Sequence, residues 1–127
     1  MKMNQKKLAL FVDDDNHFLE ALEGLLEHQK FEVQTYVAKN GYHVIDEVIK
    51  RKPDVLFMDF NLPRANGGQI LPVLRSIKSF AKVPVYFVTG HNDQEVKPLL
   101  KDMFYNGILK KTDALISEIT NVLNQTA

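Results

Sequence analysis

Two patterns of apolar and polar residues take turns along this chain, and together they predict strands and helices in alternation. Short apolar runs predict strands at about 8–12, 55–58, 83–88 and 107–109, and alternating residues predict a half-exposed strand at 31–37. Elsewhere apolar residues recur three and four positions apart, which predicts amphipathic helices at about 16–29, 44–51, 70–77, 96–103 and 115–123. Five strands that alternate with five helices predict an α/β fold, with helices on both faces of a parallel sheet.

One carboxylate stands directly after the central apolar run. The run Val55 to Met58 leads into Asp59, and the chain then turns at Pro63 and Asn66-Gly67. A lone buried charge costs several kcal/mol, so this carboxylate has to leave the core or pair with a cation. Ligands bind at the carboxyl ends of strands in open parallel sheets. Asp59 is therefore predicted to lie in a site at that edge of the sheet.

The composition narrows the class of protein. The chain has 127 residues and is long enough to bury a core, so we expect a single domain over residues 1–127, with residues 1–6 as a disordered leader. The net charge is zero, so nothing favours nucleic acid or a membrane as a partner, and without cysteine there is no thiol chemistry. No apolar stretch approaches the roughly 20 residues of a membrane-spanning helix. We expect a cytoplasmic protein.

Polar residues that suit one reaction follow the other strands. Asp13-Asp14 follow the first strand, Thr89 ends the fourth, and Lys111 follows the fifth. Converging carboxylates cannot all stay ionised without a cation, and oxygen ligands select Mg²⁺ or Mn²⁺. Asp59 is a candidate nucleophile toward a phosphoryl group, whose oxygens a metal ion, an ammonium and a hydroxyl can stabilise.

Four segments together resemble the receiver domains of two-component response regulators of the chemotaxis-regulator type. They are Phe11-Val12-Asp13-Asp14-Asp15, Met58-Asp59-Phe60-Asn61-Leu62-Pro63 with Gly67 following, Val88-Thr89-Gly90, and Gly107-Ile108-Leu109-Lys110-Lys111. Each segment is a weak signal by itself, but all four occur in the family's order and on the expected strand ends. The resemblance implies a flavodoxin-like, doubly wound sheet with strand order 2-1-3-4-5.

The resemblance also implies a metal site. Asp13 and Asp14 would hold Mg²⁺ or Mn²⁺ together with Asp59, with Asp14 as a direct ligand and Asp13 acting partly through water. The backbone carbonyl of Asn61 would complete the protein ligands. Asp15, the third consecutive aspartate, is then better interpreted as the cap of the first helix.

A switch is the function that the resemblance implies. A histidine kinase or phosphotransfer protein would donate a phosphoryl group to Asp59. Lys111 would pair with the acceptor and then with the phosphate, and Thr89 would move inward to bond a phosphoryl oxygen. Asn61 and His91 would tune how long the phosphoryl group lasts. Self-phosphorylation and self-dephosphorylation are expected, but no enzymatic action on an outside substrate.

The chain departs from the family at three places. Thr112 follows the active-site lysine where the family usually has proline, and a cis bond before a non-proline residue costs about 3–4 kcal/mol, so a trans bond is predicted. Ile108 stands where the family often has an aromatic switch residue. Phe104-Tyr105 replace a small pair before the last strand. These departures predict intact phosphorylation chemistry and an unusual output surface.

Two alternatives remain open. A receiver-like docking module would keep the fold without accepting phosphate, and the departures at Thr112 and Phe104-Tyr105 would fit it. A haloacid-dehalogenase-like phosphatase would use Asp13 as nucleophile and Asp15 as acid/base. That interpretation gives no role to Asp59, and the sequence offers no later acidic pair to hold the metal.

Overall fold

A five-stranded parallel sheet forms the centre of the computed structural model, which describes residues 6–90 and 92–126. Its strands are β1 (Leu8–Asp13), β2 (Glu32–Val37), β3 (Val55–Met58), β6 (Val85–Thr89) and β7 (Gly107–Lys110). Their order across the sheet is β2-β1-β3-β6-β7, and neighbouring strands are parallel. Counted within this sheet alone, the order is 2-1-3-4-5, so the predicted fold is confirmed.

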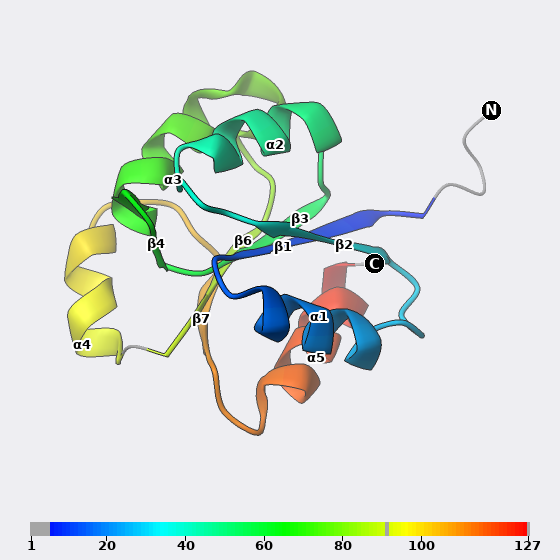
Figure 1. Cartoon of the computed structure of the whole chain (residues 1–127). Helices are drawn as coiled ribbons and strands as arrows, with labels where there is room; N and C mark the ends of the chain where they lie inside the picture. Colours follow the sequence, from blue (N-terminus) through cyan, green and yellow to red (C-terminus); the bar gives the residue numbers. More distant parts are fainter. Residues whose placement is uncertain (1–5, 91, 127) are drawn as a thin grey trace.

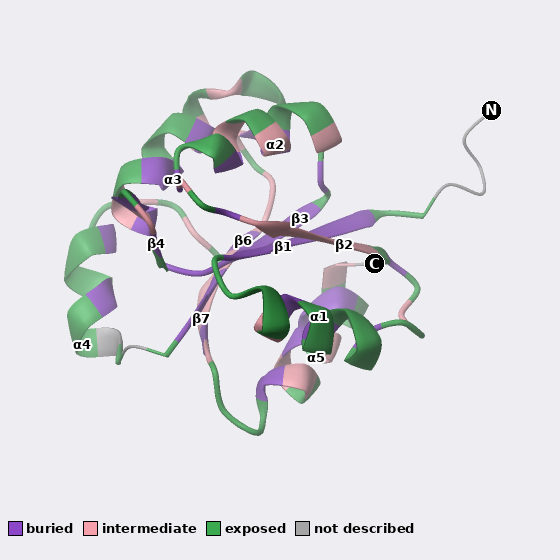
Figure 2. Ribbon diagram, viewed as in Figure 1, coloured by how far each residue is buried: buried purple, intermediate pink, exposed green. Residues whose placement is uncertain are grey.

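Helices cover both faces of the sheet (Figure 1). They are α1 (Asn16–Leu25), α2 (His43–Arg51), α3 (Gly67–Ser76), α4 (Asp93–Val96) and α5 (Leu115–Thr126). One buried apolar cluster lies between the sheet and α2, α3 and α4, and a second lies between the sheet and α1 and α5. β1 and β3 are buried along their whole length (Figure 2), which explains why their sequences are continuously apolar.

The first helix is shorter than the predicted 16–29. α1 ends at Leu25, where the N–H of Leu26 still bonds the carbonyl of Leu22 but the backbone of Leu26 leaves the helical conformation. The turn that follows lets Leu26 and Phe31 both enter the core, at 1% and 4% exposed. The predicted extension to Gln29 was wrong because it rested on polar residues that carry no periodic signal.

The fourth helix is shorter than predicted and lies earlier in the chain, overlapping the predicted 96–103 only at Val96. α4 ends at Val96 and is followed by a 3₁₀ turn, Lys97–Leu100, so helical structure stops before Met103. Pro98 explains the break, because it has no N–H to donate and disfavours helical geometry in the residue before it. Val96 and Leu100 are nevertheless buried in the cluster that also contains α3. The predicted apolar stripe is therefore confirmed at Val96 and Leu100 but not at Leu99, which is 51% exposed.

A small hairpin that the sequence pattern did not predict lies between β3 and α3. Its strands are β4 (Asn61–Leu62) and β5 (Ala65–Asn66), which pair antiparallel. Asn66 then begins α3 through a capping box, in which its side chain accepts a hydrogen bond from the N–H of Gln69 and Gln69 bonds back to the Asn66 N–H. The hairpin carries the chain from Asp59 at the sheet edge to the start of α3.

Phe104 and Tyr105 take different environments before β7. Phe104 is 57% exposed, and the Arg75 guanidinium lies 4.7 Å from its ring centroid. Arg75 also donates to the main-chain oxygens of Phe104 (3.0 Å) and Val83 (2.7 Å), so the end of α3 is tied to this segment. Tyr105 is half-buried, with its ring 6.0 Å from that of Phe87.

The start of β1 and the end of α5 meet at one edge of the molecule (Figure 1). The Lys7 ammonium donates to the main-chain oxygen of Thr126 at 3.2 Å. This is the edge from which the parallel strands begin. None of the helices in the described part of the chain has the length and apolar character needed to span a bilayer. The predicted leader, 1–6, falls outside the described residues except for Lys6.

Candidate functional site

The strand registers bring the predicted site residues to one edge of the sheet. Val12 of β1 pairs with Met58 of β3, so Asp13 and Asp59 follow at adjacent positions. The main-chain N–H of Asp59 donates to the Val12 carbonyl at 2.9 Å, which fixes this relation. These carboxylates therefore come together because parallel strands end side by side.

The carboxylates form a compact cluster with unequal exposure. Asp13, Asp14 and Asp59 each offer an oxygen, and these oxygens lie within 4.8 Å of one another. Asp13 is 1% exposed and Asp59 is 8% exposed, whereas Asp14 is exposed. Each buried carboxylate accepts one main-chain hydrogen bond: Asp13 from Asp15 at 3.0 Å and Asp59 from Asn61 at 3.3 Å. A third, open-facing carboxylate leaves the cluster accessible from solvent.

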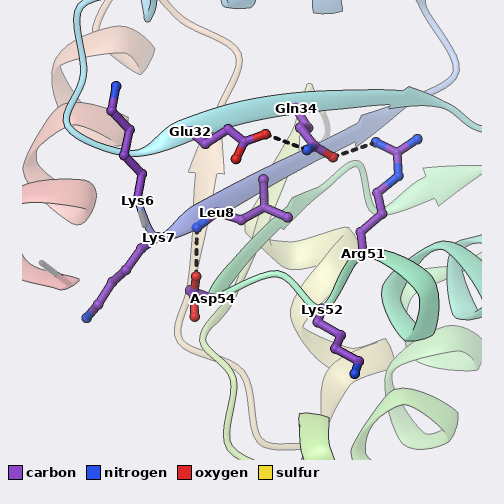
Figure 3. Close-up of a pocket in the computed structure, with 8 residues that line it drawn as sticks. All are labelled: Lys6, Lys7, Leu8, Glu32, Gln34, Arg51, Lys52 and Asp54. Atoms are coloured by element: carbon purple, nitrogen blue, oxygen red, sulfur yellow. Dashed lines mark hydrogen bonds between the residues drawn. The ribbon is translucent and has the colours of Figure 1, made fainter. Parts of the chain in front are cut away.

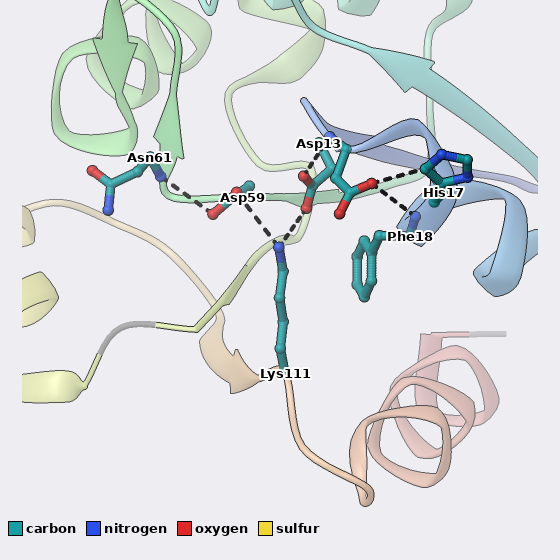
Figure 4. A network of polar contacts seen from close by, with 7 residues as sticks. Asp13, His17, Phe18, Asp59, Asn61 and Lys111 are labelled. Atoms are coloured by element: carbon teal, nitrogen blue, oxygen red, sulfur yellow. Dashed lines mark hydrogen bonds and ion pairs between the residues drawn. The ribbon is translucent and has the colours of Figure 1, made fainter.

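Lys111 supplies the cation at this edge (Figure 4). Its Nζ donates to Asp13 Oδ2 at 2.8 Å and lies 3.6 Å from Asp59 Oδ2. Burial alone would lower the pKa of Lys111, but the hydrogen bond to Asp13 and the charges of Asp59 and Asp13 outweigh burial and raise it. The ammonium is therefore charged at neutral pH. The structure thus selects Lys111, rather than Lys110, as the lysine of the site.

Lys111 does not neutralise the cluster, because one ammonium faces three carboxylates. Burial, together with the charges of Asp13 and Asp14, raises the pKa of Asp59 to about 6, against the lowering effect of Lys111 and the Asn61 N–H. Partial desolvation and the neighbouring Asp13 carboxyl also raise the pKa of Asp14. A site with this charge imbalance favours binding of a further cation.

An Asp59→Asn variant is expected to be more stable than the wild type at pH 7.5 without metal, by at most about 3 kcal/mol. The folded-state pKa of about 6 lies above the ordinary 3.8, so ionising Asp59 lowers the free energy of unfolding as pH rises from 4 through 6. The difference between the two proteins should therefore shrink toward pH 4. Urea denaturation in EDTA at several pH values measures it.

Asp46→Asn is the matched control, since it removes an exposed carboxylate from the first turn of α2, away from the cluster. This control should change stability by less than about 0.5 kcal/mol. If Asp59→Asn were no more stable than the wild type at pH 7.5, the claim that burial and the neighbouring carboxylates disfavour ionised Asp59 would be refuted.

The donor set fits a hard divalent cation. Three converging carboxylates with one open side are ligands that Mg²⁺ and Mn²⁺ prefer, and Mg²⁺ is commonly bound by few protein oxygens plus water. The hydrogen bond from the Asn61 N–H also brings the Asn61 main chain to the cluster. That the Asn61 carbonyl is a ligand stays a prediction.

The remaining predicted residues take distinct places. Thr89 is fully buried at the end of β6, and its carbonyl accepts a hydrogen bond from the Lys111 N–H at 3.0 Å. No cis peptide bond occurs in the described residues, so the predicted trans bond between Lys111 and Thr112 is confirmed. Asp15 caps α1 by accepting from the N–H groups of His17 and Phe18, as predicted. His91 lies outside the described residues.

Sequence reasoning missed one contact of the site. The Phe18 ring, from the first turn of α1, lies beside the Lys111 side chain (Figure 4), with Nζ 4.4 Å from the ring centroid. The helical pattern marked Phe18 as an apolar position, and the family resemblance placed it on the first helix beside the site, where the donor would dock, but neither predicted its contact with Lys111. A contact between the first helix and the loop after the last strand depends on tertiary structure, so no local signal in the sequence identifies it.

A hollow of about 530 Å³ lies at the opposite edge of the sheet. Figure 3 shows that its lysines, Lys6, Lys7 and Lys52, point away from one another. One oxygen of Asp54 in this hollow already accepts a hydrogen bond from the protein, since Asp54 Oδ2 accepts from the N–H of Leu8 at 2.7 Å. The groups that line this hollow do not converge on a common point, so the hollow is a weaker candidate site than the carboxylate cluster.

The chain is similar to known proteins over most of its length. The chain matches the family model of the response regulator receiver domain over residues 9–122. It is 30% identical to the transcriptional regulatory protein DegU of Brevibacillus brevis over 116 residues, which are 89% of this chain and 48% of that protein. It is 28% identical to the probable transcriptional regulator ycf29 of Pyropia yezoensis over 117 residues, 90% of this chain and 52% of that protein. The chain thus spans about half the length of these relatives.

Solved structures show the same fold. Chemotaxis protein CheY4 of Vibrio cholerae superposes with a TM-score of 0.81 at 21% identity, covering 96% of this chain and 99% of that one. The receiver domain of the sensor histidine kinase PA1611 of Pseudomonas aeruginosa carries a coordinated magnesium ion in its active-site cleft. It has a TM-score of 0.80 at 19% identity, covering 94% of this chain and 96% of that one.

The phosphatase alternative needs Asp15 as acid/base, but the Asp15 side chain caps helix α1. With the family model matching nearly its whole length, this chain belongs to the response regulator receiver domains.

Proposed function

We propose that this chain is a phospho-accepting signalling switch of a two-component system, with Asp59 as the acceptor. The observation that carries the proposal is the position of Lys111, whose ammonium lies 2.8 Å from Asp13 and 3.6 Å from Asp59 at the open end of the sheet. A carboxylate can act as nucleophile toward phosphorus, and a charged ammonium beside it can stabilise the transferred oxygens.

The donor is a histidine kinase or a phosphotransfer protein. An oxygen of Asp59 attacks the phosphorus of a phosphohistidine, the new O–P bond forms, and the P–N bond breaks as the imidazole leaves with its electron pair and takes up a proton. Lys111 offsets the charge on the transferred oxygens. Its longer distance to Asp59 than to Asp13 supports this role, because the ammonium is not fully committed to the acceptor.

Asp13, Asp14, Asp59 and the backbone carbonyl of Asn61 would hold Mg²⁺ or Mn²⁺. When bound, the metal supplies positive charge that stabilises the transferred phosphoryl oxygens. The unbalanced charge of the cluster supports this assignment. So do the magnesium ion in the related receiver domain described above and the Mn²⁺-bound form of the response regulator Rcp1, which has a TM-score of 0.69 to this chain.

Thr89 and its neighbours transmit the change. The hydroxyl of Thr89 moves to donate a hydrogen bond to a phosphoryl oxygen. This movement shifts the balance between two conformations of the surface made by α4, β7 and α5. Two main-chain contacts of Thr89 support this coupling: it pairs with Lys110, the last residue of β7, and its carbonyl accepts the N–H of Lys111. Asn61 and His91 tune the lifetime of the phosphoryl group. The protein acts in the cytoplasm, and its downstream partner is a protein.

Intact mass after incubation with acetyl phosphate tests the proposal. The wild type is expected to gain one phosphoryl group with Mg²⁺ and none in EDTA, and Asp59→Ala is expected to gain none under either condition. The exposed carboxylate variant Asp46→Ala, outside the cluster, should be modified like the wild type. An unmodified wild type that is folded and binds Mg²⁺ would refute the switch and favour a docking module.

A further inference from the structure

Phe18 is held in place from two sides. Its main-chain N–H donates to the capping carboxylate of Asp15 at 3.2 Å, which fixes the first turn of α1. Its side chain is half-buried and packs against the apolar cluster between the sheet and helices α1 and α5. The ring is therefore a fixed surface when Lys111 approaches it, and Nζ lies 4.4 Å from the ring centroid.

The side chain of Lys111, in contrast, is held through its ammonium by one hydrogen bond and one longer ion pair. Its side chain is flexible, extends from the end of β7 and is 26% exposed. Within the described residues it makes one hydrogen bond, to Asp13, and its 3.6 Å separation from Asp59 exceeds hydrogen-bond length. Confining a lysine side chain to one position costs up to about 2 kcal/mol of side-chain entropy, which opposes the attraction by Asp13 and Asp59. A further contact that attracts the ammonium would therefore favour the inward position.

An aromatic ring can do this in a way that a polar group cannot. A ring face attracts an ammonium through its quadrupole, by about 0.5–2 kcal/mol, without accepting a directed hydrogen bond. A carboxylate or carbonyl in the same place would bind one of the three N–H donors. We infer that Phe18 is a positioning residue, which holds Lys111 inward while leaving its N–H groups available for Asp13, Asp59 and the incoming phosphoryl oxygen.

The inference rests on the proposed phosphoryl transfer and adds a residue of α1 to the machinery. It requires an aromatic ring at position 18. Tyrosine at position 18 keeps the ring face, whereas leucine keeps apolar packing but removes the ring. A cation–ring contact requires that the leucine variant be phosphorylated more slowly than the tyrosine variant. If Phe18 served only to pack against the cluster, the two variants would not differ in this way.

The test compares Phe18→Leu, Phe18→Tyr and the wild type with a small donor, acetyl phosphate, so that docking of a protein donor has no part. The control is Phe31→Leu, the same loss of a ring from the same apolar cluster, in the turn that precedes β2 at the other edge of the sheet. With Mg²⁺ saturating, Phe18→Leu should be phosphorylated about 3- to 10-fold more slowly. Phe18→Tyr and Phe31→Leu should stay within about twofold of the wild type.

A second measurement reports the contact itself, without donor or metal. The methylene protons next to the Lys111 ammonium should resonate upfield in the wild type and Phe18→Tyr, because they lie near a ring face, and should lose that shift in Phe18→Leu. A wild-type rate in Phe18→Leu, or no change in the resonances, would overturn the positioning role alone. Failure of every protein, wild type included, to take up phosphate would overturn both this role and the proposed function.

Discussion

A Lys111→Met variant is expected to accept phosphoryl groups at least about 100-fold more slowly than the wild type and to bind Mg²⁺ about tenfold more tightly. Methionine keeps most of the length and apolar character of the stem but has no charge. The rate falls because the ammonium no longer stabilises the transferred oxygens. Removal of one preorganised charge of this kind typically slows a reaction by about 10²–10³-fold.

The tighter metal binding has the opposite electrostatic origin. Lys111 places a positive charge 2.8 Å from Asp13 and 3.6 Å from Asp59, beside the oxygens proposed to hold the cation. A like charge near a surface site opposes binding by about 1–4 kcal/mol, so its removal strengthens binding. Few other changes would slow the chemistry while improving metal affinity, so the paired result is diagnostic.

The measurements are the rate of acetyl phosphate labelling at saturating Mg²⁺ and the Mg²⁺ dissociation constant by titration. Saturating Mg²⁺ matters because Asp13, 1% exposed, would otherwise lose its partner. Lys110→Met is the matched control, one residue earlier in β7, and should stay within about twofold for both quantities. Labelling of Lys111→Met at the wild-type rate would show that the ammonium is not part of the transfer machinery.

A Gly67→Ala variant is expected to lower the free energy of unfolding by about 2–4 kcal/mol. A Cβ at Gly67 would overlap Phe87 Cε1 and would lie 2.8 Å from Phe60 Cδ1. Both rings are fully buried and pack edge to face at 5.6 Å, so neither can rotate away into solvent. Overpacking in such a place forces the surroundings to move. Urea denaturation measures the loss.

Gly24→Ala is the control for this change. Gly24 lies inside α1, and a Cβ there would meet no atom within 4 Å, so alanine should stabilise the protein by about 0.5–1 kcal/mol through helix propensity. Equal effects of the two substitutions would contradict the close approach at Gly67. Because Phe60 directly follows Asp59, Gly67→Ala should also slow phosphorylation of the folded fraction.

Much of the site could be predicted because it depends on a simple geometric rule. Parallel strands that end in polar residues bring those residues to one edge, so Asp13, Asp59 and Lys111 were predicted to meet, and they do. The cap at Asp15 was predicted for a similar reason, since an aspartate before a helical pattern has a local partner in the next turn. These features need only strand ends, helix starts and their order.

The rest depends on interactions that no local pattern contains. The end of α1 at Leu25 is set by the burial of Leu26 and Phe31, and the truncated α4 is set by Pro98, which the apolar stripe conceals. The contact of Phe18 with Lys111 joins residues from the first helix and the last loop. Such features are set by packing between distant segments, so they appear only when the whole chain is folded.

The meeting of Lys7 with Thr126 has a consequence for protein engineering. α5 returns from the site edge to the edge where β1 begins, and the 3.2 Å hydrogen bond between these residues brings the two ends of the sheet-and-helix core together. Neighbouring ends of this kind tolerate circular permutation. A short peptide that joins this pair, with the chain reopened in the turn after α1, should give a permuted protein whose carboxylate edge is untouched. A reporter fused beside Thr126 would likewise begin on the side away from Asp59.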